Sequence, residues 1–148
     1  MDDTQAAEFQ FAGQDLPWLL RSWAESQPDK TLLIWEPKEG EGARWTYGEF
    51  QTATRRLAAG LAARGITKGD KIVIHCDNCP EMVLAWYACA TLGAVGVTTN
   101  TRSVRAELEF FITKTGCVGA ITQPQFASMV ALFTSRLAIG LPRCERVV

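Results

Sequence analysis

The chain has 148 residues, of which 47% are hydrophobic and 21% charged, the size and composition of one folded α/β domain. A formal net charge of −1 excludes the broad positive field typical of nucleic-acid binding, and the longest strongly apolar stretch, Met82–Ala90, is far shorter than the roughly 20 residues that span a bilayer. The N-terminal residues MDDTQAAEF lack the basic-then-apolar order of a signal peptide, so we expect a cytoplasmic protein without a membrane span.

The N-terminal region is predicted to hold a flexible arm, a helix and a hairpin. Residues 1–14 form the arm, and residues 15–148 form the domain. The helix Leu16–Ser26 ends before Pro28 and carries its apolar side chains on one face: Leu16, Leu19, Leu20 and Trp23. The segments Thr31–Trp35 and Ala43–Trp45 are predicted to pair as a hairpin around a charged turn that contains glycine.

A capping box then predicts a long helix. Thr46 and Glu49 have the spacing in which each side chain satisfies the other's backbone N–H, so the helix Tyr47–Arg64 is expected to begin there. Its apolar stripe comprises Phe50, Ala53, Leu57 and Leu61, and Arg55 and Arg56 point away from that stripe.

Residues 65–100 are predicted to form one βαβ unit. The strand Lys71–His75 leads through a polar corner to the helix Pro80–Leu92, which Gly93 ends, and Ala94–Val97 forms the second strand. Because the working groups of parallel sheets lie beyond the carboxyl ends of the strands, we expect residues 75–78 and 98–102 to share one edge of the sheet.

The remaining sequence continues the alternation. Ser103 is predicted to cap a helix to about Thr115 with Val104, Leu108, Phe111 and Ile112 on one face, and Cys117–Thr122 is the next strand. Gln125–Leu137 has helical spacing, and Glu145–Val148 resembles the start of a further strand. The predicted fold is therefore α/β, with a doubly wound, mainly parallel sheet and helices on both faces.

The order of several motifs resembles the N-terminal region of the AMP-forming acyl-CoA synthetases, and within them most closely the crotonobetaine/carnitine–CoA ligases. The motifs are GI-x-KGDK from Gly65, H-x-DNCPE from His75, the segment Arg44-Trp45-Thr46-Tyr47, and Asn100-x-Arg102-x-x-Arg105-x-Glu107. The resemblance extends from about Leu16 to Phe133. It rests on the order of these motifs along the chain, because no single motif is diagnostic alone.

The resemblance implies an ATP-dependent ligase that uses Mg²⁺, activates a small-molecule carboxylate as an acyl-adenylate and transfers the acyl group to CoA. The family's phosphate-binding loop, S/T-G-x-T-G-x-P-K, does not occur in these 148 residues. We therefore expect an incomplete N-terminal subdomain that is inactive alone and carries no catalytic residue. The alternative is a non-catalytic stand-alone α/β interaction module from a truncated gene, and a homo-oligomer stays open in either case.

The segment Thr98–Ser103 is the best candidate for a binding site. It follows a strand and precedes a helix N-terminus, a place suited to anions. By the resemblance, Asn100, Thr101 and Arg102 lie near the CoA nucleotide, and Arg102 could bind a CoA phosphate. The alternative, in which Arg102 is a solvated surface charge and Asn100 a turn residue, stays equally open.

The polar corner after the first βαβ strand permits several roles. His75, the sole histidine, could be a general base by its intrinsic pKa, but we favour a hydrogen-bonded corner residue. For Asp77 and Asn78 we favour capping of the following helix over ligand binding. Trp86 and Tyr87 lie on a helix that is apolar nearly all round, so both are predicted to be core residues.

Cys76 and Cys79 have the spacing of a redox pair at a helix start, where a thiol pKa is lowered. We favour a structural role, because the order of elements does not suit a thioredoxin-like fold and zinc would need two more ligands, with only His75 near. The odd total of five cysteines fits free thiols in a reducing compartment: Cys76, Cys79, Cys89, Cys117 and Cys144. No metal site is predicted.

Overall fold

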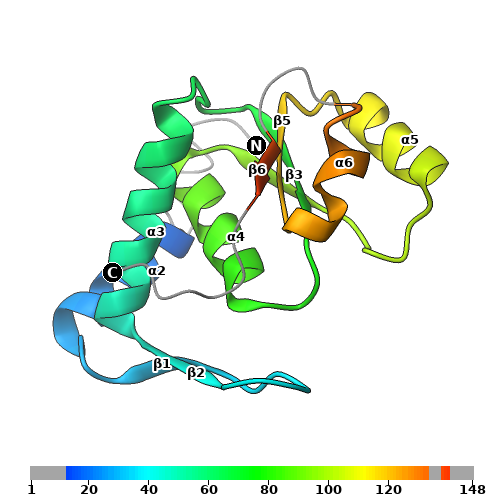
Figure 1. Cartoon of the computed structure of the whole chain (residues 1–148). Coiled ribbons are helices and arrows are strands. Elements are labelled where there is room, and N and C mark those ends of the chain that lie inside the picture. Colours follow the sequence, from blue (N-terminus) through cyan, green and yellow to red (C-terminus); the bar gives the residue numbers. More distant parts are fainter. Residues whose placement is uncertain (1–12, 134–137, 141–148) are drawn as a thin grey trace.

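A computed structural model describes residues 13–133 and 138–140 of the chain (Figure 1). Most of the predicted arm and the predicted strand Glu145–Val148 lie outside these residues. The central feature is a four-stranded sheet in the order β4-β3-β5-β6, in which every adjacent pair is parallel. Its strands are β3 (Lys71–His75), β4 (Val95–Thr98), β5 (Gly119–Thr122) and β6 (Ala138–Gly140). The parallel sheet is confirmed.

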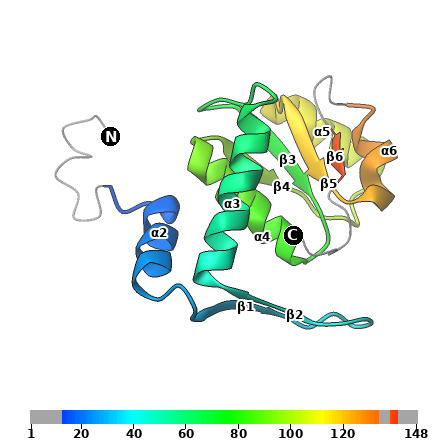
Figure 2. The same ribbon diagram turned by 60° about the vertical axis from the view of Figure 1, so that its left-hand side comes forward.

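Helices cover both faces of the sheet, as predicted (Figure 2). Helices α3 (Tyr47–Ala62) and α4 (Pro80–Leu92) pack on the face to which Ile72 and Ile74 point. Helix α5 (Arg105–Thr115) and the short α6 (Ala127–Val130) pack on the opposite face with Val73. Since alternate residues of one strand enter two separate cores, β3 is buried on both sides after its first residue, as is typical of a central parallel strand.

The N-terminal elements add a third, smaller core. Helix α2 (Leu16–Ser26) packs against α3 and α4, and strands β1 (Thr31–Trp35) and β2 (Ala43–Thr46) form the predicted antiparallel hairpin. The capping box is confirmed: Thr46 N–H donates to Glu49 Oε2 at 2.9 Å, and Glu49 N–H donates to Thr46 Oγ1 at 3.2 Å. Helix α3 ends at Ala62, two residues before the predicted Arg64.

Two predicted apolar faces are wrong in part. In α2 only Leu20 of the predicted stripe is buried, and Leu16, Leu19 and Trp23 are 36 to 43% exposed. Trp23 stacks instead on Tyr47, with 5.8 Å between ring centroids. In α5, Leu108 and Ile112 are buried as predicted, but Val104 and Phe111 are exposed.

The two C-terminal helices also differ from the prediction, one in its cap and one in its length. The N-cap residue of α5 is Val104, not Ser103. Valine has no side-chain acceptor, so the end is closed by Glu107, whose Oε2 accepts the Val104 N–H at 3.1 Å, while Ser103 N–H donates to the carbonyl of Asn100. In place of the first part of the predicted helix Gln125–Leu137 there is a 3₁₀ turn, Pro124–Phe126, followed by the one-turn α6, and residues 134–137 of that prediction lie outside the described residues.

Trp86 is 50% exposed, so its predicted place in the core is wrong, whereas Tyr87 is half-buried and packs edge-on against Phe50. The indole lies across the edge strand β4 at Gly96, where an added Cβ would come within 3.1 Å of Trp86 Cδ1. The indole therefore contacts β4 while half of the side chain remains exposed. No helix within the described ranges is long and apolar enough to cross a membrane.

Candidate functional site

Three loops meet at the carboxyl edge of the sheet, and Asp77 joins them. Its Oδ1 accepts the Thr101 hydroxyl at 2.7 Å, and its backbone N–H donates to Gln123 Oε1 at 2.8 Å. Gln125 Nε2 lies 3.5 Å from Asp77 Oδ2. The loops after β3, β4 and β5 are thus tied to one another. The prediction that residues 75–78 and 98–102 share one edge is confirmed.

Asp77 does not cap α4, so that part of the capping prediction is wrong. The N-cap residue of α4 is Cys79, which makes no side-chain cap, and Pro80 follows at the first helical position. The Asp77 carboxylate reaches sideways to the loops after the neighbouring strands. Asn78 is exposed, and no capping hydrogen bond of its side chain occurs among the described residues.

His75 is the hydrogen-bonded corner residue that we favoured. Its side chain is fully buried, its Nδ1 lies 2.8 Å from Thr99 Oγ1, and its carbonyl accepts the Thr122 hydroxyl at 2.7 Å. The ring packs edge-on against Phe126, and Nε2 is buried without a hydrogen-bond partner. Burial lowers the pKa of His75 below 6.5, and the charge of Asp77 opposes this shift. The imidazole is therefore neutral at pH 7.

The loop that follows β4 is organised by its own polar groups. Asn100 Oδ1 accepts the Arg102 N–H at 2.9 Å, which forms an Asx turn, and the Thr101 hydroxyl is used by Asp77. Arg102 is exposed. Of the three residues predicted to bind the CoA nucleotide, Asn100 and Thr101 shape the loop in this structure, and Arg102 presents its guanidinium at the surface.

The two cysteines of the corner are not arranged as an exposed redox pair. Cys76 is 5% exposed, and its thiol lies 3.8 Å from the carbonyl of Ile121. A hydrogen bond between the two thiols lowers the pKa of Cys76 and, together with burial, raises the pKa of Cys79. The thiol with the lowered pKa is the buried one, which limits its access to a reaction partner. Both are free thiols, and no group of three metal-ligating side chains gathers within the described part of the chain.

Sequence reasoning placed Thr99 at this edge but missed its contact with His75, and it missed Gln123 altogether. Thr99 binds the His75 ring, and Gln123 binds the Asp77 backbone. The signal for Gln123 is non-local, because β5 comes after α5 in the chain but lies beside β3 in the sheet.

Comparisons with known proteins agree with this architecture. The model of the AMP-binding enzyme family matches residues 20–145. Crotonobetaine/carnitine–CoA ligase of Citrobacter koseri is 33% identical over 117 residues, which cover 79% of this chain and 23% of that protein. The same-named protein of Escherichia coli O6:H1 is 34% identical with the same coverage. The chain thus spans about a quarter of the length of these relatives.

Solved structures are similar over most of the chain. O-succinylbenzoate coenzyme A synthetase from Bacillus subtilis, in complex with ATP and magnesium ion, matches with a TM-score of 0.71 and 28% identity, over 83% of this chain and 32% of that one. The fatty acyl CoA synthetase of Mycobacterium tuberculosis matches with a TM-score of 0.72 and 27% identity, over 88% and 24%. The N-terminal subdomain of NpsA from Klebsiella oxytoca matches with a TM-score of 0.65 and 25% identity, over 72% and 27%.

Proposed function

The chain belongs to the AMP-binding enzyme family, and on that premise we propose that it forms part of an ATP-dependent acyl-CoA ligase. The observation that carries the proposal is its 33 to 34% identity to crotonobetaine/carnitine–CoA ligases over 79% of its length. The doubly wound fold and the similarity to acyl-CoA synthetase structures support it. Its free cysteines fit a cytoplasmic enzyme.

The proposed reaction has two half-reactions. A carboxylate oxygen attacks the α-phosphorus of ATP, pyrophosphate leaves and an acyl-adenylate forms. The CoA thiol then loses its proton and attacks the acyl carbonyl carbon, AMP leaves and a thioester remains. Mg²⁺ would screen the phosphate charge of ATP, but the described residues gather no three metal ligands, so we assign them no part in holding it.

We place the contribution of this chain in the second half-reaction, at the loop from Thr98 to Ser103. Arg102 stands exposed on that loop, where its guanidinium can make charge-assisted hydrogen bonds to a CoA phosphate. Two contacts fix the loop: Thr101 to Asp77, and Thr99 to the buried ring of His75. A fixed loop lowers the entropy that binding costs, which favours a role as a preorganised rim for the nucleotide.

The carboxylate is proposed to be crotonobetaine or carnitine, or another small or medium-chain acid. The test is an assay of the full-length gene product with ATP, CoA and a panel of these acids, in which AMP and thioester are both measured. We expect AMP and thioester in equal amounts with at least one acid. ATP-independent thioester formation, or no turnover with the entire panel, would contradict the proposal.

We also propose that these 148 residues alone do not complete the reaction, because they lack the family's phosphate-binding loop motif. The isolated chain, incubated with ATP, Mg²⁺, CoA and the same acids, should release no AMP above the buffer rate. Turnover by the pure chain would overturn this point without affecting the family assignment.

A further inference from the structure

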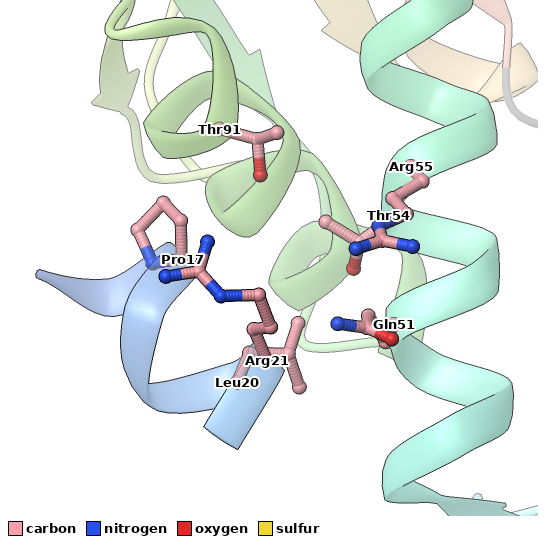
Figure 3. Close-up of a pocket in the computed structure, with 7 residues that line it drawn as sticks. All are labelled: Pro17, Leu20, Arg21, Gln51, Thr54, Arg55 and Thr91. Atoms are coloured by element: carbon pink, nitrogen blue, oxygen red, sulfur yellow. The ribbon is translucent and has the colours of Figure 1, made fainter. Parts of the chain in front are cut away.

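A cavity of about 160 Å³ lies between α2, α3 and α4 (Figure 3). Its lining comes from all three helices: Pro17, Leu20 and Arg21 from α2, Gln51, Thr54 and Arg55 from α3, and Thr91 from α4. Thr91 is one residue from the C-terminal end of α4, whereas the carboxyl edge of the sheet borders the N-terminal end of that helix. Since 13 helical residues rise about 20 Å, the cavity is remote from the proposed CoA rim.

Thr54 has an unusual hydroxyl for a helical threonine. Thr52 and Thr91 donate their hydroxyls to carbonyls one turn earlier, Gly48 at 2.9 Å and Tyr87 at 2.8 Å. The side chain of Thr54 is 1% exposed, and its Oγ1 has no hydrogen-bond partner. A buried hydroxyl without a hydrogen-bond partner costs free energy of folding. The Thr54 hydroxyl is therefore an unsatisfied polar group beside the cavity.

The cavity is positively charged. Arg21 of α2 and Arg55 of α3 both line it, with the Arg21 guanidinium beside Pro17 and the Arg55 guanidinium beside Thr54, and no carboxylate is among the lining residues (Figure 3). Gln51 adds an amide that can donate. The Thr91 hydroxyl already donates to its own helix, so the remaining donors are the two guanidinium groups, Gln51 and Thr54.

We propose that this cavity is a binding site for a small oxyanion of the phosphate class, held between Arg21 and Arg55 with the Thr54 hydroxyl as a further donor. Planar guanidinium groups bind phosphate oxygens in pairs, and a phosphate offers enough acceptors for both arginines and the hydroxyl. The Thr54 oxygen is itself buried, so an anion in the cavity reaches it only if neighbouring side chains move. The anion thereby satisfies a buried group that the protein alone leaves unpaired.

The test is a titration of the isolated chain with sodium phosphate, followed by ¹H–¹⁵N NMR and by thermal unfolding, with sodium chloride at matched ionic strength as reference. Acetate tests a carboxylate, and glycerol 2-phosphate separates a free anion from a phosphate carried on an organic group. The variants are Arg21→Gln, Arg55→Gln and Thr54→Val. The matched control is Arg56→Gln, which removes the same charge from an exposed neighbour that does not line the cavity.

We expect saturable shifts at Arg21, Thr54 and Arg55 and a higher unfolding temperature with phosphate. Loss of either cavity arginine should weaken binding about tenfold or more, and Arg56→Gln should leave it unchanged. Three results would overturn the proposal: equal effects of chloride and phosphate, equal weakening in the Arg55 and Arg56 variants, or undiminished binding by Thr54→Val. An effect of acetate alone would also overturn the phosphate class.

Discussion

The buried histidine should make the stability of this chain depend on pH. In the folded state, burial lowers the pKa of His75 below its ordinary 6.5, whereas in the unfolded chain the imidazole is solvated and keeps that value. As the pH falls below 6.5 the unfolded state binds a proton that the folded state does not, so the free energy of unfolding decreases. The loss is complete when the pH passes the lowered folded-state pKa.

The size of the effect follows from one proton. Over the window in which only the unfolded state is protonated, stability changes by up to about 1.4 kcal/mol per pH unit. His75 is the single histidine of the chain, so no other side chain has an ordinary pKa near 6.5. The nearby Asp77 charge opposes the lowering of the His75 pKa, and it therefore narrows the pH range in which only the unfolded state is protonated.

The assay is urea unfolding of the isolated chain at several pH values between 5 and 8. His75→Asn keeps a polar group near Thr99 but cannot titrate, so its free energy of unfolding should vary less between pH 7 and 5.5 than that of the wild type. Thr99→Val serves as the control, because it removes the 2.8 Å contact but keeps the histidine and therefore the pH dependence. Equal slopes in the wild type and His75→Asn, or a wild type that gains stability as the pH falls, would refute the reasoning.

Three further predictions concern single features. Cys76→Ser with Cys79→Ser in the full-length protein should leave thioester formation intact, since neither thiol is assigned chemistry; lost activity at unchanged stability would contradict this. Thr54→Val should raise the free energy of unfolding by about 1 kcal/mol in urea, because a buried hydroxyl without a partner is removed, and a decrease would show that the hydroxyl has one. Gly96→Ala should cost about 1–3 kcal/mol and change the fluorescence of Trp86, since the new Cβ would meet Ile74 and Trp86 at 3.0 and 3.1 Å; unaltered stability would mean that the indole moves aside freely.

The elements that the sequence predicts best are those with local signals. Helix α4 was predicted from Pro80 and Gly93, and it begins and ends at those signals, with Gly93 at φ +67°. The capping box at Thr46 and the run of β-branched residues in β3 are equally local. Each signal acts within a few residues, so it can be identified without knowing the rest of the fold.

The errors have non-local causes. Asp77 was predicted to cap the helix that follows it, but the order of strands brings Thr101 and Gln123 within its reach. Trp86 was predicted to be buried because α4 is apolar nearly all round, yet it lies against β4, the strand at one end of the described sheet, and is half exposed. Neither the strand order nor the position of an edge follows from periodicity.

The contribution of Arg102 to CoA binding is the central claim, and one substitution tests it most directly. In the full-length protein, Arg102→Ala removes a guanidinium whose charge-assisted contact with phosphate is typically worth about 1.5–3 kcal/mol. Lys114→Ala is the matched control, because it removes the same charge from the C-terminal turn of α5. The measurement is thioester formation against CoA concentration, with acyl-adenylate formation followed separately.

We predict that Arg102→Ala raises the apparent CoA requirement roughly ten- to hundredfold and leaves acyl-adenylate formation little changed. Lys114→Ala should leave both the CoA requirement and acyl-adenylate formation little changed. If the contact is to the ribose phosphate, wild type and variant should perform alike with dephospho-CoA. An unchanged CoA dependence in Arg102→Ala would contradict the account and indicate that Arg102 is a solvated surface charge with no part in CoA binding.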